Sequence, residues 1–237
     1  MCIRDRYWTL NTLFPNGNGT LPSSSFGAGT RQSVVLFPDI TDAGTNLAFN
    51  GTYYYYNGNL SGGAGWRQSG VSGTIVNDLA IAPDTAFLVR LNAATNTTTT
   101  LVGSVPMSGF ATPLSTLAAN TQQDIVIGMA VPSNVTLAQS NLTAVFTPST
   151  SFGAAQRKDQ LLVYNNAASG QNKAFTTTYY YYSGLGGPAG WRLSGDTTDI
   201  QDNTPVFQPG NGYLIRKTAT ASPTTVTWTF VPPYLSP

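Results

Sequence analysis

Two stretches of the sequence share one pattern. Residues 51–56 read Gly-Thr-Tyr-Tyr-Tyr-Tyr and are followed by Gly-Trp-Arg at 65–67. Residues 177–182 read Thr-Thr-Tyr-Tyr-Tyr-Tyr and are followed by Gly-Trp-Arg at 190–192. The tyrosine runs are 126 residues apart (179 − 53) and the tryptophans 125 (191 − 66). A repeat with this long a period indicates duplication of a whole folding unit.

The repeat extends beyond these two motifs. Ser-Phe-Gly-Ala at 25–28 returns at 151–154, and PDTAFLVR at 83–90 returns as PGNGYLIR at 209–216. Because the spacing stays at 125–126 residues across all these motifs, the sequence predicts two tandem homologous units.

Unit boundaries follow from where the repeat stops. Residues 7–107 are predicted to form repeat unit 1, truncated at its N-terminus, and residues 108–237 a linker and repeat unit 2. The linker is placed within 107–123, which has no counterpart after the last strand of unit 2. Met1–Arg6 resemble the translated remnant of a sequencing adapter and are left out of the fold prediction. We therefore expect the true N-terminus, with any signal peptide, to be missing.

Composition favours short strands over helices. The chain of 237 residues has 24 Gly and 15 Pro, 41% hydrophobic and only 9% charged residues, and every acidic residue is Asp. Glu favours helices, whereas Thr, Val and Tyr favour strands. We predict an all-β fold in which each unit is a small antiparallel sandwich or partly open barrel with at most a short helix. The predicted strands are 34–37, 52–56, 86–90, 99–105, 124–131, 160–164, 176–182, 212–217 and 226–230, with one or two helical turns at 136–142.

Several classes of function are disfavoured by what the sequence lacks. The formal net charge is +1 without a basic cluster, which argues against nucleic-acid binding. No apolar run approaches the roughly 20 residues that span a bilayer. Cys2 is the only cysteine, so no internal disulfide can form, and histidine is absent, which excludes Ser-His-Asp, Cys-His and His-metal sites. A glycosidase would need an Asp pair, for which Asp78 and Asp84 are conceivable, but the second copy has Asn203 and Gly210 there. We therefore predict no enzyme, no catalytic residues and no cofactor.

The tyrosine runs are the first candidate binding residues. Side chains alternate between the faces of a strand, so one pair of each run can enter the core while the other faces outward. An exposed pair could stack against a sugar ring, whereas two buried pairs would be structural. The candidate residues are Tyr53, Tyr54, Tyr55 and Tyr56 in the first copy and Tyr179, Tyr180, Tyr181 and Tyr182 in the second.

Charged residues near the motifs leave further alternatives open. Arg67 and Arg192 could stack on aromatic rings as a packing device or bind an anionic group. Asp196, Asp199 and Asp202 lie in one loop and could hold calcium or form a solvated turn, although their spacing is not that of a standard calcium loop. No metal site is assigned from the sequence.

The motifs together resemble a family of uncharacterised secreted, β-rich repeat proteins from environmental bacteria. The resemblance rests on Trp8-Thr9-Leu10, Leu13-Phe14-Pro15, the tyrosine run, Gly-Trp-Arg and the strand at 209–216. It implies export and a β-rich fold and brings no known activity or catalytic residues. The first copy departs from the pattern, with Pro-Asp-Thr-Ala at 83–86 in place of Pro-Gly-Asn-Gly at 209–212.

These observations favour a non-enzymatic, exported β-repeat protein with a structural or adhesive role at the cell surface or in the extracellular matrix. The alternative is a carbohydrate-binding protein that uses exposed tyrosine pairs. The expected partners are polysaccharide or other surface proteins, with no nucleic acid and no membrane span in this fragment.

Overall fold

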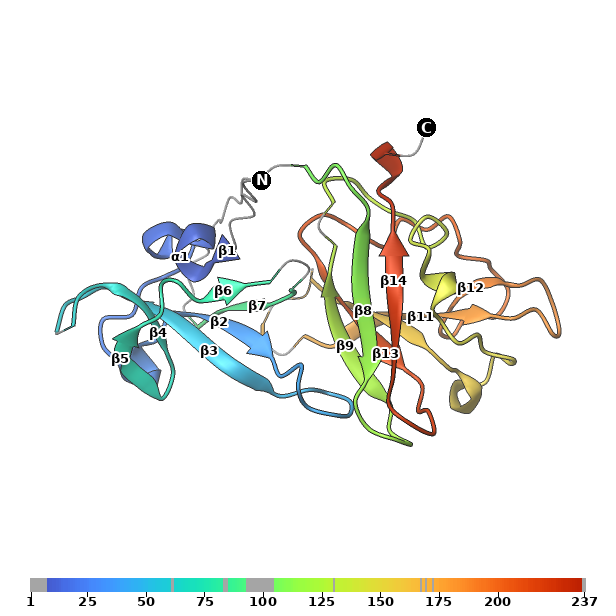
Figure 1. Cartoon of the computed structure of the whole chain (residues 1–237), viewed down its shortest axis with the longest axis horizontal. Coiled ribbons are helices and arrows are strands. Elements are labelled where there is room, and N and C mark those ends of the chain that lie inside the picture. The colour runs from blue at the N-terminus through green and yellow to red at the C-terminus, as the bar shows by residue number, and fades with distance from the viewer. Residues whose placement is uncertain are drawn as a thin grey trace, which may run out of the picture. The chain divides into compact units, whose positions relative to one another are not determined.

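The chain folds into antiparallel β-sheets joined by loops and short helical turns, which confirms the all-β prediction (Figure 1). In this computed structural model, contacts divide the chain into two compact units: unit 1 comprises residues 1–39 and 48–104, and unit 2 comprises 40–47 and 105–237. Among the described residues, the only α-helix has four residues and no sheet closes into a barrel. The structure describes residues 8–60, 62–82, 85–92, 105–129, 131–166, 168, 170–171 and 173–235.

Three features named from the sequence lie outside the described residues. They are Cys2, Asp84 of the conceivable Asp pair, and residues 99–104 of the strand predicted at 99–105. Of the residues that are described, no helix combines the length and the apolar character needed to cross a bilayer.

Unit 1 is built on a five-stranded antiparallel sheet in the order β5-β4-β3-β2-β7, with β1 and β6 forming a separate pair. Val34, Val35 and Leu36 are buried in β2, because successive side chains of this apolar run pack on both faces of the sheet. The elements are β1 Trp8–Thr9, α1 Leu10–Leu13, η1 Pro15–Gly17, η2 Ala28–Thr30, β2 Ser33–Pro38, β3 Phe49–Tyr56, β4 Gly65–Gln68, β5 Val71–Ile75, β6 Ala80–Ile81 and β7 Leu88–Leu91.

Unit 2 has a five-stranded antiparallel sheet in the order β12-β11-β10-β13-β9, together with a two-stranded sheet formed by β8 and β14. Its elements are β8 Phe110–Thr116, β9 Gln123–Gly128, η3 Leu142–Ala144, η4 Ala154–Gln156, β10 Gln160–Tyr164, β11 Phe175–Tyr182, β12 Gly190–Leu193, β13 Gly212–Lys217, β14 Thr224–Phe230 and η5 Pro233–Leu235.

The linker predicted within 107–123 is wrong over its central part, because Phe110–Thr116 forms β8. This strand pairs with β14 over seven residues without a register shift. Pro113 concealed the strand in the sequence, since proline is rare inside a sheet. The available signal was the period of two that places Leu114 and Thr116 on one face of a strand, and both are buried.

The two five-stranded sheets share four strands in the same order and register. Val35 faces Tyr53 in unit 1, and Leu161 faces Tyr179 in unit 2. On the other side of the same central strands, β2 pairs with β7 and β10 pairs with β13. Each sheet also has one strand that the other lacks among the described residues: β5 lies beyond β4, and β9 lies beyond β13.

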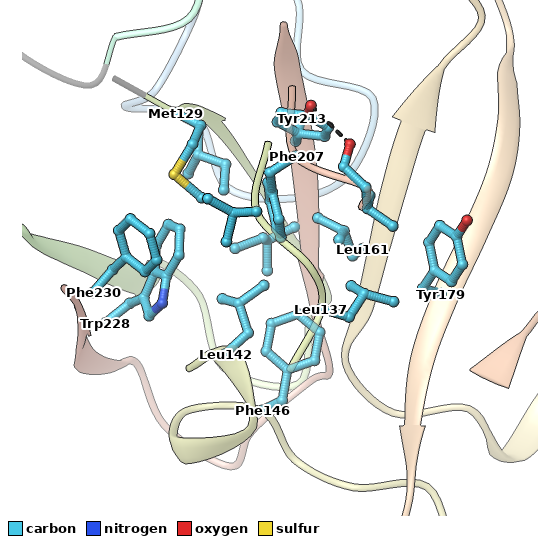
Figure 2. Close-up of a cluster of buried hydrophobic side chains, with 14 of the residues drawn as sticks. Met129, Leu137, Leu142, Phe146, Leu161, Tyr179, Phe207, Tyr213, Trp228 and Phe230 are labelled. Carbon is cyan, nitrogen blue, oxygen red and sulfur yellow. Dashed lines mark hydrogen bonds between the residues drawn. The ribbon is translucent and has the colours of Figure 1, made fainter. Parts of the chain in front are cut away.

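The main core of unit 2 lies between its five-stranded sheet and the β8–β14 pair (Figure 2). Trp228 and Phe230 contribute from β14, Leu161 and Tyr179 from the larger sheet, and the indole of Trp228 donates a hydrogen bond to the carbonyl oxygen of Ser140 at 2.7 Å. The loop between β9 and β10 completes this core with Leu137, Leu142 and Phe146. The arrangement is a small sandwich.

This loop contains a polar turn within 136–142, where the sequence predicts one or two helical turns. The backbone N–H of Gln139 donates to Oγ1 of Thr136 at 3.2 Å, and the N–H of Thr136 donates to the Gln139 side chain at 3.0 Å. Thr9 and Thr12 make the same reciprocal pair at the start of α1 in unit 1. In both places the paired side chains satisfy backbone donors that a helical turn leaves free.

Candidate functional site

Each tyrosine run ends a strand that has a hydrogen-bonded neighbour on both sides. In β3, Tyr53 and Tyr55 face the core that contains Trp66, whereas Tyr54 and Tyr56 face the opposite side of the sheet. In β11, Tyr179 and Tyr181 share a core with Trp191, and alternation directs the other two tyrosines away from it.

The second face of each sheet is covered by the segment that precedes the central strand. In unit 1, the Phe26 ring lies 4.6 Å from that of Tyr56, and the Arg31 guanidinium lies 4.7 Å from the ring centre of Tyr54. Arg31 is held there by hydrogen bonds to Ser69 Oγ and the carbonyl oxygen of Phe26. The Ser-Phe-Gly-Ala motif and the arginine after it therefore form a lid over the tyrosines.

Unit 2 repeats this lid. The Phe152 ring lies 4.4 Å from that of Tyr182, and the Arg157 guanidinium lies 5.1 Å from the ring centre of Tyr180. Arg157 donates to Ser194 Oγ at 2.6 Å and to the carbonyl oxygen of Phe152. The covering role of this motif was missed in the sequence, although its 126-residue recurrence was visible there.

The exposed tyrosine pair that a sugar platform requires is absent from both runs. Tyr54 and Tyr56 are fully buried under the lid, and Tyr53 is buried in the core with only 8% of its surface exposed. Tyr55 is half-buried against Trp66, at 5.9 Å between ring centres. Tyr179, Tyr180, Tyr181 and Tyr182 show the same burial, so the structural alternative describes both runs.

Arg67 and Arg192 are buried cations whose terminal guanidinium nitrogens donate to backbone carbonyls, whereas the Nε of each has no hydrogen-bond partner among the described residues. Each is only 1% exposed. Arg67 donates to the carbonyl oxygens of Ser72, at 3.2 Å, and of Gly62 and Gly63 in the glycine-rich turn. Each guanidinium also lies within 6 Å of two ring centres, those of the lid phenylalanine and of the last tyrosine of the run. These contacts make both arginines packing groups, and neither presents its charge to solvent.

Arg192 makes the matching contacts in unit 2. It donates to the carbonyl oxygens of Thr198 and Pro188, both at 2.7 Å. Gly190 beside it has a φ of +157°, and a Cβ there would lie 2.9 Å from Ile200. The glycine in Gly-Trp-Arg is therefore required by close packing of the following loop.

The two tryptophans are buried at equivalent positions. Trp66 is fully buried and Trp191 is 1% exposed. Phe14 packs against Trp66 at 5.7 Å and Phe146 against Trp191 at 5.2 Å. The sequence prediction that the indoles fill the core is confirmed.

The aspartates considered for calcium serve two local structures, a turn shared by Asp196 and Asp199 and a backbone contact made by Asp202. Asp196 Oδ1 accepts hydrogen bonds from the N–H and the hydroxyl of Thr198 and from the N–H of Asp199, and these bonds, those from Thr198 above all, lower the pKa of this exposed carboxyl. Asp202 Oδ1 instead accepts from the N–H of Trp191 at 2.8 Å, as Asn77 does for Trp66 in unit 1. No group of three or more His, Cys, Asp or Glu side chains suited to a metal ion occurs among the described residues.

Among its described residues, unit 2 contains two ion pairs whose partners could not be matched from the sequence. Arg216 binds Asp124 through two hydrogen bonds of 2.7 and 2.9 Å, which raise the pKa of the guanidinium. Lys217 pairs with the fully buried Asp159 and donates to the carbonyl oxygen of Val145 at 2.7 Å. The partners are 92 and 58 residues apart in sequence, so no local pattern links them.

Comparison of the chain with protein-family models, with curated proteins and with solved structures gave no match.

Proposed function

We propose that the protein is a non-enzymatic, exported β protein with a structural or adhesive role at the cell surface or in the extracellular matrix. The observation that carries this proposal is that the recurring tyrosines, tryptophans and Gly-Trp-Arg arginines are buried or half-buried in both units. Their aromatic rings and guanidinium groups contact one another and the backbone, which is the chemistry of a scaffold.

Surface chemistry supports the same role. Only 9% of the residues are charged, and the exposed positions of β14 are threonines and a valine. Hydroxyl and methyl groups can contact polysaccharide or another protein over a wide area without a deep site. Any adhesion would then use strand faces and loops, because the tyrosine pairs are covered.

Display on a heterologous bacterium tests this proposal. We expect cells that export the chain through a supplied signal and anchor to acquire protease-resistant surface protein and to adhere to one another or to a polysaccharide-coated surface. Cells that display an unrelated β protein of similar size and net charge are the control. Failure to adhere above this control would contradict the proposal.

A second arm addresses catalysis and specific sugar binding. The purified chain is offered ester, glycoside and peptide substrates and a glycan array. Reproducible turnover of any substrate would overturn the non-enzymatic assignment. Tight binding of one glycan, retained in a Tyr55→Ala and Tyr181→Ala double variant, would place a sugar site away from the tyrosine runs.

A further inference from the structure

The edges of the sheets in unit 2 are not equally protected. An unpaired strand edge can bind a strand of another chain, and proteins usually shield it. β9 is shielded by residues 40–47, since Asp124 N–H donates to the Gly44 carbonyl oxygen at 2.8 Å and Asn46 N–H donates to Asp124 Oδ2 at 2.7 Å. β12 is met by the loop after it, where Gln201 N–H donates to the Trp191 carbonyl oxygen at 2.9 Å.

Hydrogen bonds around β14 show which of its backbone groups face away from β8. Thr224 N–H donates to Oγ1 of Thr116 on β8, so Thr224 faces β8. The Thr229 carbonyl oxygen accepts from the side chain of Asn141, which is not part of β8. Backbone groups alternate in an antiparallel pair, so those of Thr225 and Thr227 also point outward.

The same alternation explains the proline in β8. Pro113 lies opposite Thr227, so its nitrogen faces the outer edge of β8. A proline there removes no bond to β14 and leaves the middle of that outer edge without a donor, which disfavours strand addition. β8 is therefore protected.

β14 lacks these protections over its first half. Its seven residues include no charge and no proline, and its register with β8 is continuous. Thr225, Val226 and Thr227 are exposed, and β8 is the only strand that pairs with β14 among the described residues. A long, regular, uncharged edge of this kind favours pairing with another strand.

We propose that the outer edge of β14 pairs with β14 of a second copy of this chain, antiparallel and about a two-fold axis. Such an interface is self-complementary, because the outward N–H and C=O groups of Thr225 in one copy meet those of Thr227 in the other. A formal net charge of +1 leaves little repulsion between copies. Side-chain hydroxyls already pair across this sheet, with Ser115 Oγ 2.8 Å from Thr225 Oγ1. The pairing follows from the strand edges alone and does not depend on the role proposed above.

Sedimentation equilibrium of the whole chain tests the pairing. We expect a reversible monomer–dimer equilibrium at concentrations up to about 1 mM. Thr227→Pro removes the outward N–H in both copies and should weaken dimerisation at least about tenfold. Ser115→Pro is the matched control, because it places the same residue at an outward position of β8, where Pro113 already occurs.

Introducing a positive charge at the same edge tests the pairing without a proline. Thr227→Lys brings two cations close to the two-fold axis and should also abolish the dimer, whereas Ser115→Lys should not. Circular dichroism checks that each variant folds. If a proline variant does not fold, the comparison of Thr227→Lys with Ser115→Lys decides the question. A wild-type chain that stays monomeric would overturn the proposal. So would a dimer unaffected at position 227, or open-ended assemblies, which indicate a different edge such as β5.

Discussion

At the scale of single residues, the tyrosines of one strand differ in how their hydroxyls are satisfied. Tyr182 Oη accepts a hydrogen bond from the Gly186 N–H in the glycine-rich turn. Tyr180 Oη is buried under Arg157 and has no hydrogen-bond partner among the described residues. A buried hydroxyl without a partner contributes a desolvation penalty, whereas a paired one is stabilising.

This difference predicts opposite results for two conservative substitutions. Tyr182→Phe leaves the Gly186 N–H without its partner and should lower the free energy of unfolding by about 1 kcal/mol. Tyr180→Phe should leave it unchanged or raise it by a few tenths of a kcal/mol. Urea unfolding of both variants makes the comparison, with Tyr54→Phe in unit 1 as a replicate. A larger loss for Tyr180 than for Tyr182 would show that its hydroxyl is hydrated or bonded after all.

The buried Asp159–Lys217 pair can be tested with residues that the protein itself uses elsewhere. At the positions 126 residues earlier, unit 1 has Ser33 and Leu91, which face each other across β2 and β7. Asp159→Ala leaves the buried ammonium of Lys217 without its partner and should lower the free energy of unfolding by about 3–5 kcal/mol. The double variant Asp159→Ser and Lys217→Leu should recover most of this loss.

Thermal and urea unfolding of the two variants measure the recovery. The control is Lys217→Leu alone, which leaves a buried carboxylate and should be destabilised like the alanine variant. If the double variant is no more stable than Asp159→Ala, then the hydrogen bonds from Thr147 and Thr218 to Asp159 are the main contribution of this site.

At the scale of elements, the sequence predicted strands well where composition and turn residues agree. β10 at 160–164 and β13 at 212–217 have the predicted bounds, because each is an apolar run between polar turns. The sequence did not identify the lid over the tyrosines, because residues 25–28 have neither helical nor strand periodicity. It also left open whether an outward tyrosine pair is exposed, since alternation alone does not say what covers the second face of a sheet.

The burial of the tyrosines in β3 and β11 predicts a loss of stability at alkaline pH. Burial raises the pKa of Tyr53 and Tyr179 above the ordinary value of 10.0 by disfavouring the charged phenolate. Between the unfolded and folded pKa values, the unfolded chain binds fewer protons than the folded one. This contribution to stability is therefore complete below about pH 10 and is lost as the pH rises through the folded pKa.

Ultraviolet absorbance of tyrosinate and circular dichroism across an alkaline titration measure this effect. We expect the ionisation of these tyrosines to coincide with unfolding, and a Tyr53→Phe and Tyr179→Phe double variant to lose stability less steeply. Reversible ionisation of all tyrosines near pH 10, with secondary structure intact, would contradict the burial of these rings.

At the scale of the whole molecule, the compact units are not continuous in sequence, because one segment within the first half of the chain belongs to unit 2. Residues 40–47 connect β2 and β3 of unit 1, but they belong to unit 2. A hydrogen bond joins the two residues that flank this connection, because the Asp39 N–H donates to the Ala48 carbonyl oxygen at 2.7 Å. Beyond it, the segment hydrogen-bonds to Gln123 and Asp124 and shields the edge of β9.

Replacing residues 40–47 with a two-residue Asn-Gly turn, which removes the backbone groups that reach unit 2, should therefore weaken unit 2 rather than unit 1. The Asp124 carboxylate would lose the Asn46 N–H, and the β9 edge would lose its cover, a change worth roughly 1–3 kcal/mol. Hydrogen exchange followed by mass spectrometry resolves the two units. We expect faster exchange in peptides from β9 and β13 and unchanged protection in β2 and β3, which the intact Asp39–Ala48 bond still closes. Equal protection of β9 with and without the segment would mean that these hydrogen bonds add nothing to the stability of unit 2.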